Sequence, residues 1–247
     1  MPPTTVTTER PLVIAHRGAS ADAPENTIAA FELALTQGAE GLELGVHLSR
    51  DGHPVVIHDF TLERTTDGAG PVGALTMREL KRLDAGGWRD RKFRGQRVQT
   101  LQEVLERFRD RTRFWVELRG GVGLYPTLEE RVVSTLEIYE VLDRTLVQTY
   151  DRDAFPRLRG LSPGLRVGAL VGRAPVDPRI LDPGGADAVC GEAHLLTDDL
   201  LGAARRARRE CFARKADEPV QVDRLVRGNI SGFITGRPGA LRARLGR

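Results

Sequence analysis

Short apolar strands alternate with helical segments from one end of this chain to the other, without a low-complexity linker. Strands and helices in alternation form βαβ units and a parallel sheet, and eight such strands are the number that closes a barrel. The predicted strands cover residues 12–16, 40–45, 113–119, 145–149, 166–171, 187–190, 211–216 and 231–235. The predicted helices cover residues 26–37, 100–109, 127–142, 151–159, 197–209 and 219–227. The sequence therefore predicts an α/β protein with a TIM-type (β/α)8 barrel.

One stretch, VHLSRDGHPVVIH at 46–58, departs from this rhythm. Two extended runs flank Asp51-Gly52, a strong hairpin signal because type I′ turns need positive φ at both central positions. The runs are too close together for a parallel crossover. We therefore expect a β-hairpin extension after the second strand. A two-residue turn pairs positions whose numbers sum to about 103, which places Gly45 opposite His58 and brings His58 to the barrel mouth.

Length and composition fit a single domain over residues 1–247. Barrels of this type commonly fill roughly 250 residues, and 40% of this chain is hydrophobic. No apolar run approaches the ~18 residues of a membrane-spanning helix. The stretch from Met1 to Arg10 lacks the apolar segment of a secretory signal. We expect a cytoplasmic protein without a membrane span, and the sequence carries no signal for an oligomeric state.

Positive charge gathers late in the chain, where residues 201–247 hold twelve Arg and Lys against four Asp and Glu. No aromatic residues interleave with the arginines of 205–209 and 242–247, as they would in a protein that binds single-stranded nucleic acid. We interpret these arginines as solvated faces of helices and expect no nucleic-acid partner. Cys190 and Cys211 lie in apolar stretches without metal-ligand spacing, which predicts inert core residues.

A histidine and an arginine end the first predicted strand. His16 belongs to the residue type best suited to exchange protons near neutral pH, and Arg17 offers a planar fork that matches a phosphate. A histidine at a strand end is as often structural, so the pair alone leaves both roles open. Glu25 and Asn26 follow, and we expect Glu25 to orient Arg17 and Asn26 to cap the next helix.

Two glutamates occupy predicted strands near the same end of the barrel. Glu43 lies in the second strand, and Glu117 precedes Arg119 at the end of the third. Charged side chains inside a barrel are costly unless they are paired or bound to a metal. Converging glutamates suggest a site for a hard cation, Mg²⁺ or Ca²⁺. Ion pairs with Arg17 and Arg119 explain them equally well.

These motifs occur together and in order as AHRGASADAPENT, EGLEL, DGHPVVIHDFTLERTTDGAG, QTLQEVL and WVELR. The set resembles the glycerophosphodiester phosphodiesterase family, densely over residues 11–119 and sparsely afterwards. The resemblance implies a TIM barrel with an inserted region after the second histidine. It also implies cleavage of small glycerophosphodiesters to glycerol phosphate and an alcohol, a place in lipid metabolism, and use of a divalent metal.

The resemblance assigns roles to two histidines, two arginines and two glutamates. They are an acid–base pair (His16 and His58), phosphate ligands (Arg17 and Arg119) and two of three metal-binding carboxylates (Glu43 and Glu117). The third carboxylate is missing, because the family pattern Glu-x-Asp reads Glu43-Leu44-Gly45 here. A hard cation depends on such carboxylates, so the resemblance implies a weakened metal site.

Three further departures concern residues around the pocket. Arg119 stands where the family usually has Lys, which keeps the charge and changes the geometry. The family's Trp-Thr-Val-Asn segment is Arg214-Lys215-Ala216-Asp217, and its Thr-Asp-x-Pro segment is Thr235-Gly236-Arg237-Pro238. Three functions remain open: a working diesterase, a degenerate barrel that binds a phosphorylated ligand without turnover, and an enzyme of this fold with another phosphorylated substrate.

Overall fold

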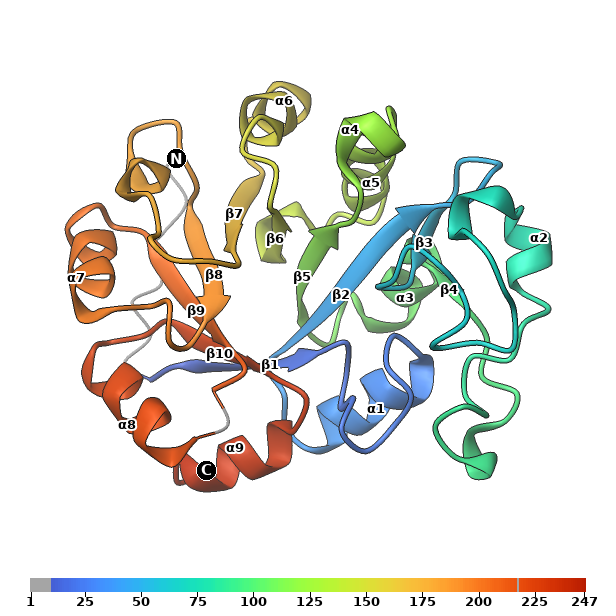
Figure 1. The fold of residues 1–247 in the computed structure, drawn as a ribbon, viewed down its shortest axis with the longest axis horizontal. Helices are drawn as coiled ribbons and strands as arrows, with labels where there is room; N and C mark the ends of the chain where they lie inside the picture. The colour runs from blue at the N-terminus through green and yellow to red at the C-terminus, as the bar shows by residue number, and fades with distance from the viewer. Residues whose placement is uncertain (1–9, 217) are drawn as a thin grey trace.

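In the computed structural model, which describes residues 10–216 and 218–247, eight parallel strands close into a barrel (Figure 1). The order around the barrel is β1-β10-β9-β8-β7-β6-β5-β2, and β1 also pairs with β2. The strands are β1 (Leu12–His16), β2 (Gly41–Leu48), β5 (Arg113–Leu118), β6 (Thr145–Thr149), β7 (Arg166–Val171), β8 (Ala188–Glu192), β9 (Glu210–Arg214) and β10 (Gly232–Thr235). The predicted TIM-type barrel is confirmed.

Helices surround the barrel in Figure 1. They are α1 (Ile28–Thr36), α2 (Met77–Leu80), α3 (Leu101–Phe108), α4 (Gly121–Leu124), α5 (Leu128–Ile138), α6 (Ala154–Leu161), α7 (Asp198–Arg206), α8 (Pro219–Arg227) and α9 (Pro238–Arg244). All six predicted helices are present, and the proline-containing link after β7 holds one short 3-10 turn, Pro178–Leu181. Among the described helices, none is both long and apolar enough to cross a bilayer.

The predicted N-cap of α1 is wrong by one residue. Thr27 is the cap, because its hydroxyl accepts a hydrogen bond from the Ala30 N–H at 3.3 Å. Asn26 instead adopts a left-handed backbone with φ 57°, which turns the chain into the helix. Asparagine tolerates this conformation better than most residues.

The barrel interior is filled by large apolar side chains from alternate strand positions. Trp115 and Phe212 meet edge to face across it, with ring centroids 5.2 Å apart. Gly41 makes room for this packing, because a Cβ there would lie 2.3 Å from the Trp115 ring. Cys190 and Cys211 are buried and free, and burial raises the pKa of both thiols, as expected of core residues.

The hairpin forms with a different register from the predicted one. β2 pairs antiparallel with β3 (Pro54–Val56), and the paired positions sum to 102, with Val46 opposite Val56. The Gly52 N–H donates to the Ser49 carbonyl at 3.0 Å, and Gly52 has a φ of +79°. A three-residue loop with glycine in the left-handed region therefore replaces the two-residue turn. Gly45 consequently lies opposite Ile57 rather than His58.

The hairpin supports an excursion between β3 and β4 (Gln99–Thr100), a short strand that pairs with β3. This excursion buries its own small core, which includes Leu62, Val72 and Leu80. In Figure 1 it extends outward from the barrel and contains α2. It begins directly after β3, so the segment that carries His58 is fixed at both ends.

The late arginines are only partly the solvated faces that we predicted. Arg205 and Arg206 are exposed at the end of α7. Arg247 instead forms an ion pair with Glu40 at 3.0 Å and donates to the Pro11 carbonyl at 2.8 Å. Arg247 thereby links the segment after α9 to the residue that precedes β1.

Candidate active site

Strand ends bring the predicted site residues to one end of the barrel. His16 ends β1, and its Cα pairs in register with Glu43 of β2. Glu117, near the end of β5, pairs in register with Gly45. The His16 Nε2 lies 4.0 Å from Glu43 Oε2, and His58 is close enough for Glu117 to influence its pKa. The structure therefore gathers both histidines and both glutamates at one mouth, as predicted.

Glu43 is completely buried, and both of its carboxylate oxygens have partners. Oε2 accepts from the Arg17 backbone N–H at 3.2 Å, and Oε1 accepts from Gln148 Nε2 at 3.2 Å. Burial, followed by the charge of Glu117, raises the pKa of Glu43 to about 7. Near neutral pH this carboxyl group is therefore partly protonated.

Glu117 is also completely buried but behaves differently. Its Oε1 accepts from Arg119 Nη1 at 2.5 Å, and its Oε2 is buried without a partner among the described residues. Burial raises the pKa of Glu117, but Arg119 and Arg214 outweigh burial and hold it below its ordinary value. Glu117 is thus the ionised member of the pair.

A continuous line of charged side chains joins Arg17 to His58. Arg17 donates to Glu25 at 2.9 Å, which confirms that Glu25 orients it. Arg64 donates to Glu25 at 2.7 and 2.9 Å and to Asp59 at 2.5 and 2.9 Å. Asp59 in turn lies 2.6 Å from His58 Nδ1. Sequence reasoning missed Arg64, because nothing in the local sequence shows that its fork bridges two separate carboxylates.

Asp59 fixes the proton position on His58. Hydrogen bonds from Arg64 hold the pKa of Asp59 well below its ordinary value, so this carboxylate only accepts. His58 Nδ1 must therefore carry a proton, which leaves Nε2 to exchange one with a ligand. Burial and the charge of Arg17 lower the pKa of His58, although Asp59 opposes them.

No hydrogen bond from residues 10–216 and 218–247 reaches the buried Nε2 atom of His16. Burial, and then the charges of Arg17 and Arg214, lower its pKa well below 6.5. His16 is therefore neutral at neutral pH and can accept a proton.

Arg119 and the hairpin take the space beside Gly45. Arg119 Nε donates to the His58 carbonyl at 3.0 Å. A Cβ on Gly45 would lie 3.3 Å from both His58 Cα and the Ile57 oxygen, and 3.5 Å from Arg119 Cγ. His47 Nε2 lies 3.0 Å from the same His58 carbonyl, so its ring supports the hairpin. The position of the missing carboxylate is thus closely surrounded by backbone and by the Arg119 stem.

Arg214, at the end of β9, reaches across the mouth. It is 9% exposed, and its Nη1 donates to the Tyr150 hydroxyl at 3.3 Å. Tyr150 follows β6, which lies three strands from β9 in the barrel order. The sequence marked Arg214 only as a departure from the family pattern. Lys215 turns aside to Glu192 at 2.6 Å, and Asp217 lies outside the described residues.

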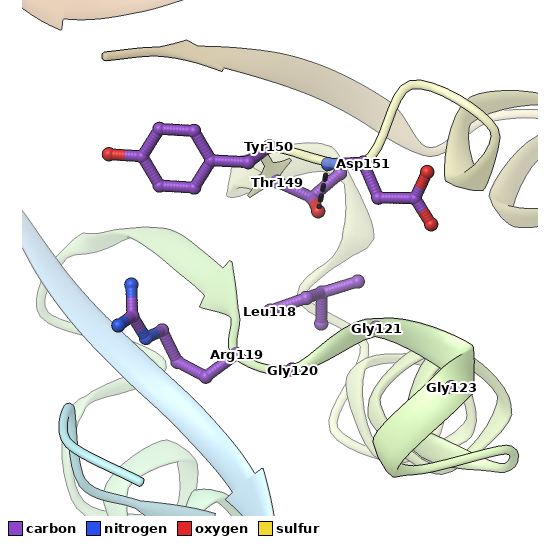
Figure 2. Close-up of a pocket in the computed structure, with 8 residues that line it drawn as sticks. All are labelled: Leu118, Arg119, Gly120, Gly121, Gly123, Thr149, Tyr150 and Asp151. Atoms are coloured by element: carbon purple, nitrogen blue, oxygen red, sulfur yellow. Dashed lines mark hydrogen bonds between the residues drawn. The ribbon is translucent and has the colours of Figure 1, made fainter.

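A cavity of about 470 Å³ opens between the ends of β5 and β6. Figure 2 shows its lining, with the side chains of Arg119 and Tyr150 projecting to the same side and Asp151 to the other. The cavity is lined by Leu118, Arg119, Gly120, Gly121, Gly123, Thr149, Tyr150 and Asp151. Arg119 is common to this cavity and to the glutamate pair, so the cavity adjoins the polar residues of the mouth.

The residues present fit a hard divalent cation poorly. The described part of the chain has no cluster of three or more His, Cys, Asp or Glu that could hold a metal. Of the four carboxylate oxygens of Glu43 and Glu117, only Glu117 Oε2 lacks a partner. Waters can complete the shell of Mg²⁺ or Ca²⁺, but the ion also needs carboxylate oxygens that are free to bind it. Here the guanidinium of Arg119 already occupies Glu117, and the charge of Arg214 acts on both glutamates.

Comparison with known proteins agrees with this geometry. A glycerophosphodiester phosphodiesterase of Caldanaerobacter subterraneus subsp. tengcongensis is 35% identical over 238 residues, or 93% of this chain and 96% of that protein. The crystal structure of a glycerophosphodiester phosphodiesterase from Agrobacterium tumefaciens has a TM-score of 0.83 at 30% identity, covering 94% of this chain and 99% of that one.

A second solved structure is an Oleispira antarctica phosphodiesterase in complex with its product sn-glycerol-3-phosphate. It has a TM-score of 0.89 at 27% identity and covers 96% of this chain and 98% of that one. The sequence model described as the glycerophosphoryl diester phosphodiesterase family matches residues 16–240, from the first histidine to the start of the last helix. The chain therefore belongs to the glycerophosphoryl diester phosphodiesterase family.

Proposed function

We propose that this protein hydrolyses a phosphodiester bond in a small glycerophosphodiester and releases glycerol phosphate and an alcohol. The observation that carries the proposal is the grouping of His16, His58 and Arg17 at one barrel mouth. Family membership supports it, as does the product sn-glycerol-3-phosphate in the Oleispira phosphodiesterase.

In this proposal the two histidines share the proton transfers. His16, whose low pKa keeps it neutral, takes a proton from the attacking water or from a neighbouring hydroxyl of the substrate. His58 gives a proton to the leaving alcohol. Burial and Arg17 hold the pKa of His58 below its ordinary value, and Asp59 beside Nδ1 offsets part of this by favouring the protonated form. Attack by a substrate hydroxyl would pass through a cyclic phosphate.

Arg17 and Arg119 bind the phosphate oxygens and stabilise the negative charge that grows in the transition state. Both guanidinium groups are held by carboxylates, Glu25 and Glu117 respectively. Their positions are therefore set before the substrate arrives, which lowers the cost of ordering them.

Enzymes of this family generally depend on a metal. Glu43 and Glu117, to which the family resemblance assigns the metal, are the residues that would hold Mg²⁺ or Ca²⁺ in this chain. We expect weak binding, because Gly45 supplies no ligand and only one carboxylate oxygen lacks a partner.

Arg214 gives a specific reason to retain the alternatives. Its guanidinium and Tyr150 change the shape and charge of the mouth on the side of β6 to β9. A barrel that binds a phosphorylated ligand without turnover, or an enzyme for another phosphorylated substrate, would carry such changes.

The deciding experiment is turnover of several glycerophosphodiesters with and without added Mg²⁺, Mn²⁺ and Ca²⁺. Release of glycerol phosphate supports the proposed hydrolysis. Binding of glycerol phosphate without turnover of any diester supports the ligand-binding alternative, and turnover only of another phosphorylated compound supports the third.

A further inference from the structure

Arg214 lies where it can influence almost every polar group of the mouth. Burial and Arg17 lower the pKa of His16 on β1, and the charge of Arg214 lowers it further. Arg214 also lowers the pKa of Glu43, against burial and the charge of Glu117, and the pKa of Glu117, where burial opposes it and Arg119 acts in the same direction more strongly. Its hydrogen bond to Tyr150 holds the side chain across the barrel. A residue that acts on β1, β2, β5 and the end of β6 occupies a central place in the mouth.

The guanidinium group has donors left over. Arginine carries five N–H donors, and within the described residues Arg214 makes one hydrogen bond, to Tyr150, and no ion pair within 4.0 Å. The other basic side chains of the mouth are each paired with a carboxylate. These pairs are Arg17 with Glu25, Arg119 with Glu117, and Lys215 with Glu192. Arg214 is thus the cation of the mouth with most capacity for an incoming anion.

The same cation opposes a metal. A divalent ion between Glu43 and Glu117 would lie within the field of Arg214, and like charges repel strongly in a buried site. Relative to the family pattern described above, Gly45 removes one negative charge and Arg214 adds one positive charge. At these two positions the mouth is therefore more positive by two charges than in the family pattern, which weakens its attraction for a divalent cation.

We propose that Arg214 takes the place of the divalent cation at this mouth, so that a phosphate group binds to Arg214 together with Arg17 and Arg119 without a metal. This inference rests on the proposed function and deepens it, because it names the group that neutralises the phosphate. Buried polar atoms without partners in the described structure, His16 Nε2 and Arg17 Nε, are consistent with a polar ligand at this position.

The test is calorimetric binding of inorganic phosphate and of sn-glycerol 3-phosphate to the full chain, first with EDTA and then with Mg²⁺ or Ca²⁺. We expect the parent to bind both compounds in EDTA, with an affinity that the metals leave unchanged. Arg214→Met keeps the apolar stem and should weaken binding on the order of ten- to hundred-fold, as expected for a lost charge-assisted hydrogen bond. Arg214→Lys should recover part of the loss.

A matched control is Arg205→Met, which removes an exposed arginine at the end of α7 and should leave phosphate binding unchanged. Metal titration gives a second readout, since Arg214→Met should bind Mg²⁺ or Ca²⁺ more tightly than the parent. Thermal melts establish whether each variant is folded. If Arg214→Met does not fold, Arg214→Lys still tests the role of the guanidinium group.

Two results would overturn the inference: parent binding that requires a metal, or unchanged binding in folded Arg214→Met. Failure of the proposed function looks different. Metal-free phosphate binding that depends on Arg214, with no turnover of any glycerophosphodiester, removes the proposed hydrolysis and leaves the inference standing. Turnover of a glycerophosphodiester that strictly requires a metal supports the proposed hydrolysis and overturns the inference about Arg214.

Discussion

The two sides of the barrel mouth hold their charges in different ways. On the N-terminal side, formed by β1, β2, β5 and the hairpin, an unbroken line of hydrogen bonds joins Arg17 to His58. On the C-terminal side, formed by β6 to β10, Arg214 donates only to the Tyr150 hydroxyl among the described residues. The first side is ordered by its own carboxylates, whereas the second has a buried cation whose charge is left for a ligand.

This difference indicates that the proposed proton transfers belong to the first side, and that the second side contributes to ligand binding. Groups that must exchange protons are held in fixed positions, because misplacement is costly in catalysis. The cations that we propose to bind the phosphate come from both sides, Arg17 and Arg119 from the first and Arg214 from the second. The following variants test one side against the other.

The largest effect should come from the histidines of the N-terminal side. His16→Ala and His58→Ala should each lower the hydrolysis rate by about 10²–10⁴-fold, the usual contribution of general acid–base catalysis. Initial rates on a diester that the parent hydrolyses measure this, with thermal melts as the folding control. A folded variant that kept nearly the parent rate would remove that histidine from the mechanism.

Glu43→Gln should stabilise the protein at alkaline pH. The pKa of Glu43 is raised from 4.5 to about 7 in the folded state, so the folded protein binds this proton more tightly than the unfolded chain. The stability tied to this proton is present below about pH 4.5 and is lost as pH rises through about 7. At pH 8 the variant should be more stable by about 3 kcal/mol.

Denaturant unfolding of Glu43→Gln and parent at pH 4 and pH 8 checks this prediction. The stability difference should be small at the lower pH and large at the higher one. Equal differences at both pH values would mean that Glu43 is not the buried acid described here.

Gly45→Asp should destabilise the fold without restoring a metal site. The new Cβ would lie 3.3 Å from the backbone of Ile57 and His58, and overpacking of this kind costs roughly 1–3 kcal/mol. Thermal melts and Mg²⁺ calorimetry should show lower stability and little gain in metal affinity. The double variant Gly45→Asp with Arg214→Met should gain more affinity for Mg²⁺ than the single variant, since it also removes the cation that repels the metal. If the single variant alone bound Mg²⁺ tightly, the C-terminal side would have no part in excluding metal.

The smallest effect concerns the acid step. Asp59 raises the pKa of His58 against burial and Arg17, so Asp59→Asn should lower it. If protonated His58 is the acid, the alkaline limb of the pH–rate profile should move to lower pH. His58 would have a different role if the acidic limb moved instead, and Arg205→Met serves as a variant whose profile should match the parent.

The sequence predicted the barrel well because hydrophobic pattern alone decides where buried strands lie. It misplaced the hairpin register by one residue, since Asp51-Gly52 is compatible with both a two- and a three-residue loop. Arg64 and Arg214 could not be assigned from sequence. Where a long side chain extends depends on which partners the closed barrel brings near, and those partners are 39 and 64 residues distant along the chain.

Pairing of β1 with β10 has a consequence for how the protein is made. β1 begins at Leu12 and its partner β10 at Gly232, so the barrel closes only after β10 has left the ribosome. Contacts of such long sequence separation form slowly, and domains begin folding from the N-terminal part during synthesis. Until closure, β1 presents an unpaired edge, the kind of surface that recruits other chains into aggregates. In the closed barrel, Arg247 forms an ion pair with Glu40 and donates to the Pro11 carbonyl just before β1. Deletion of Arg247 and the few residues before it should therefore lower the yield of soluble protein. The activity of the protein that does fold should change less.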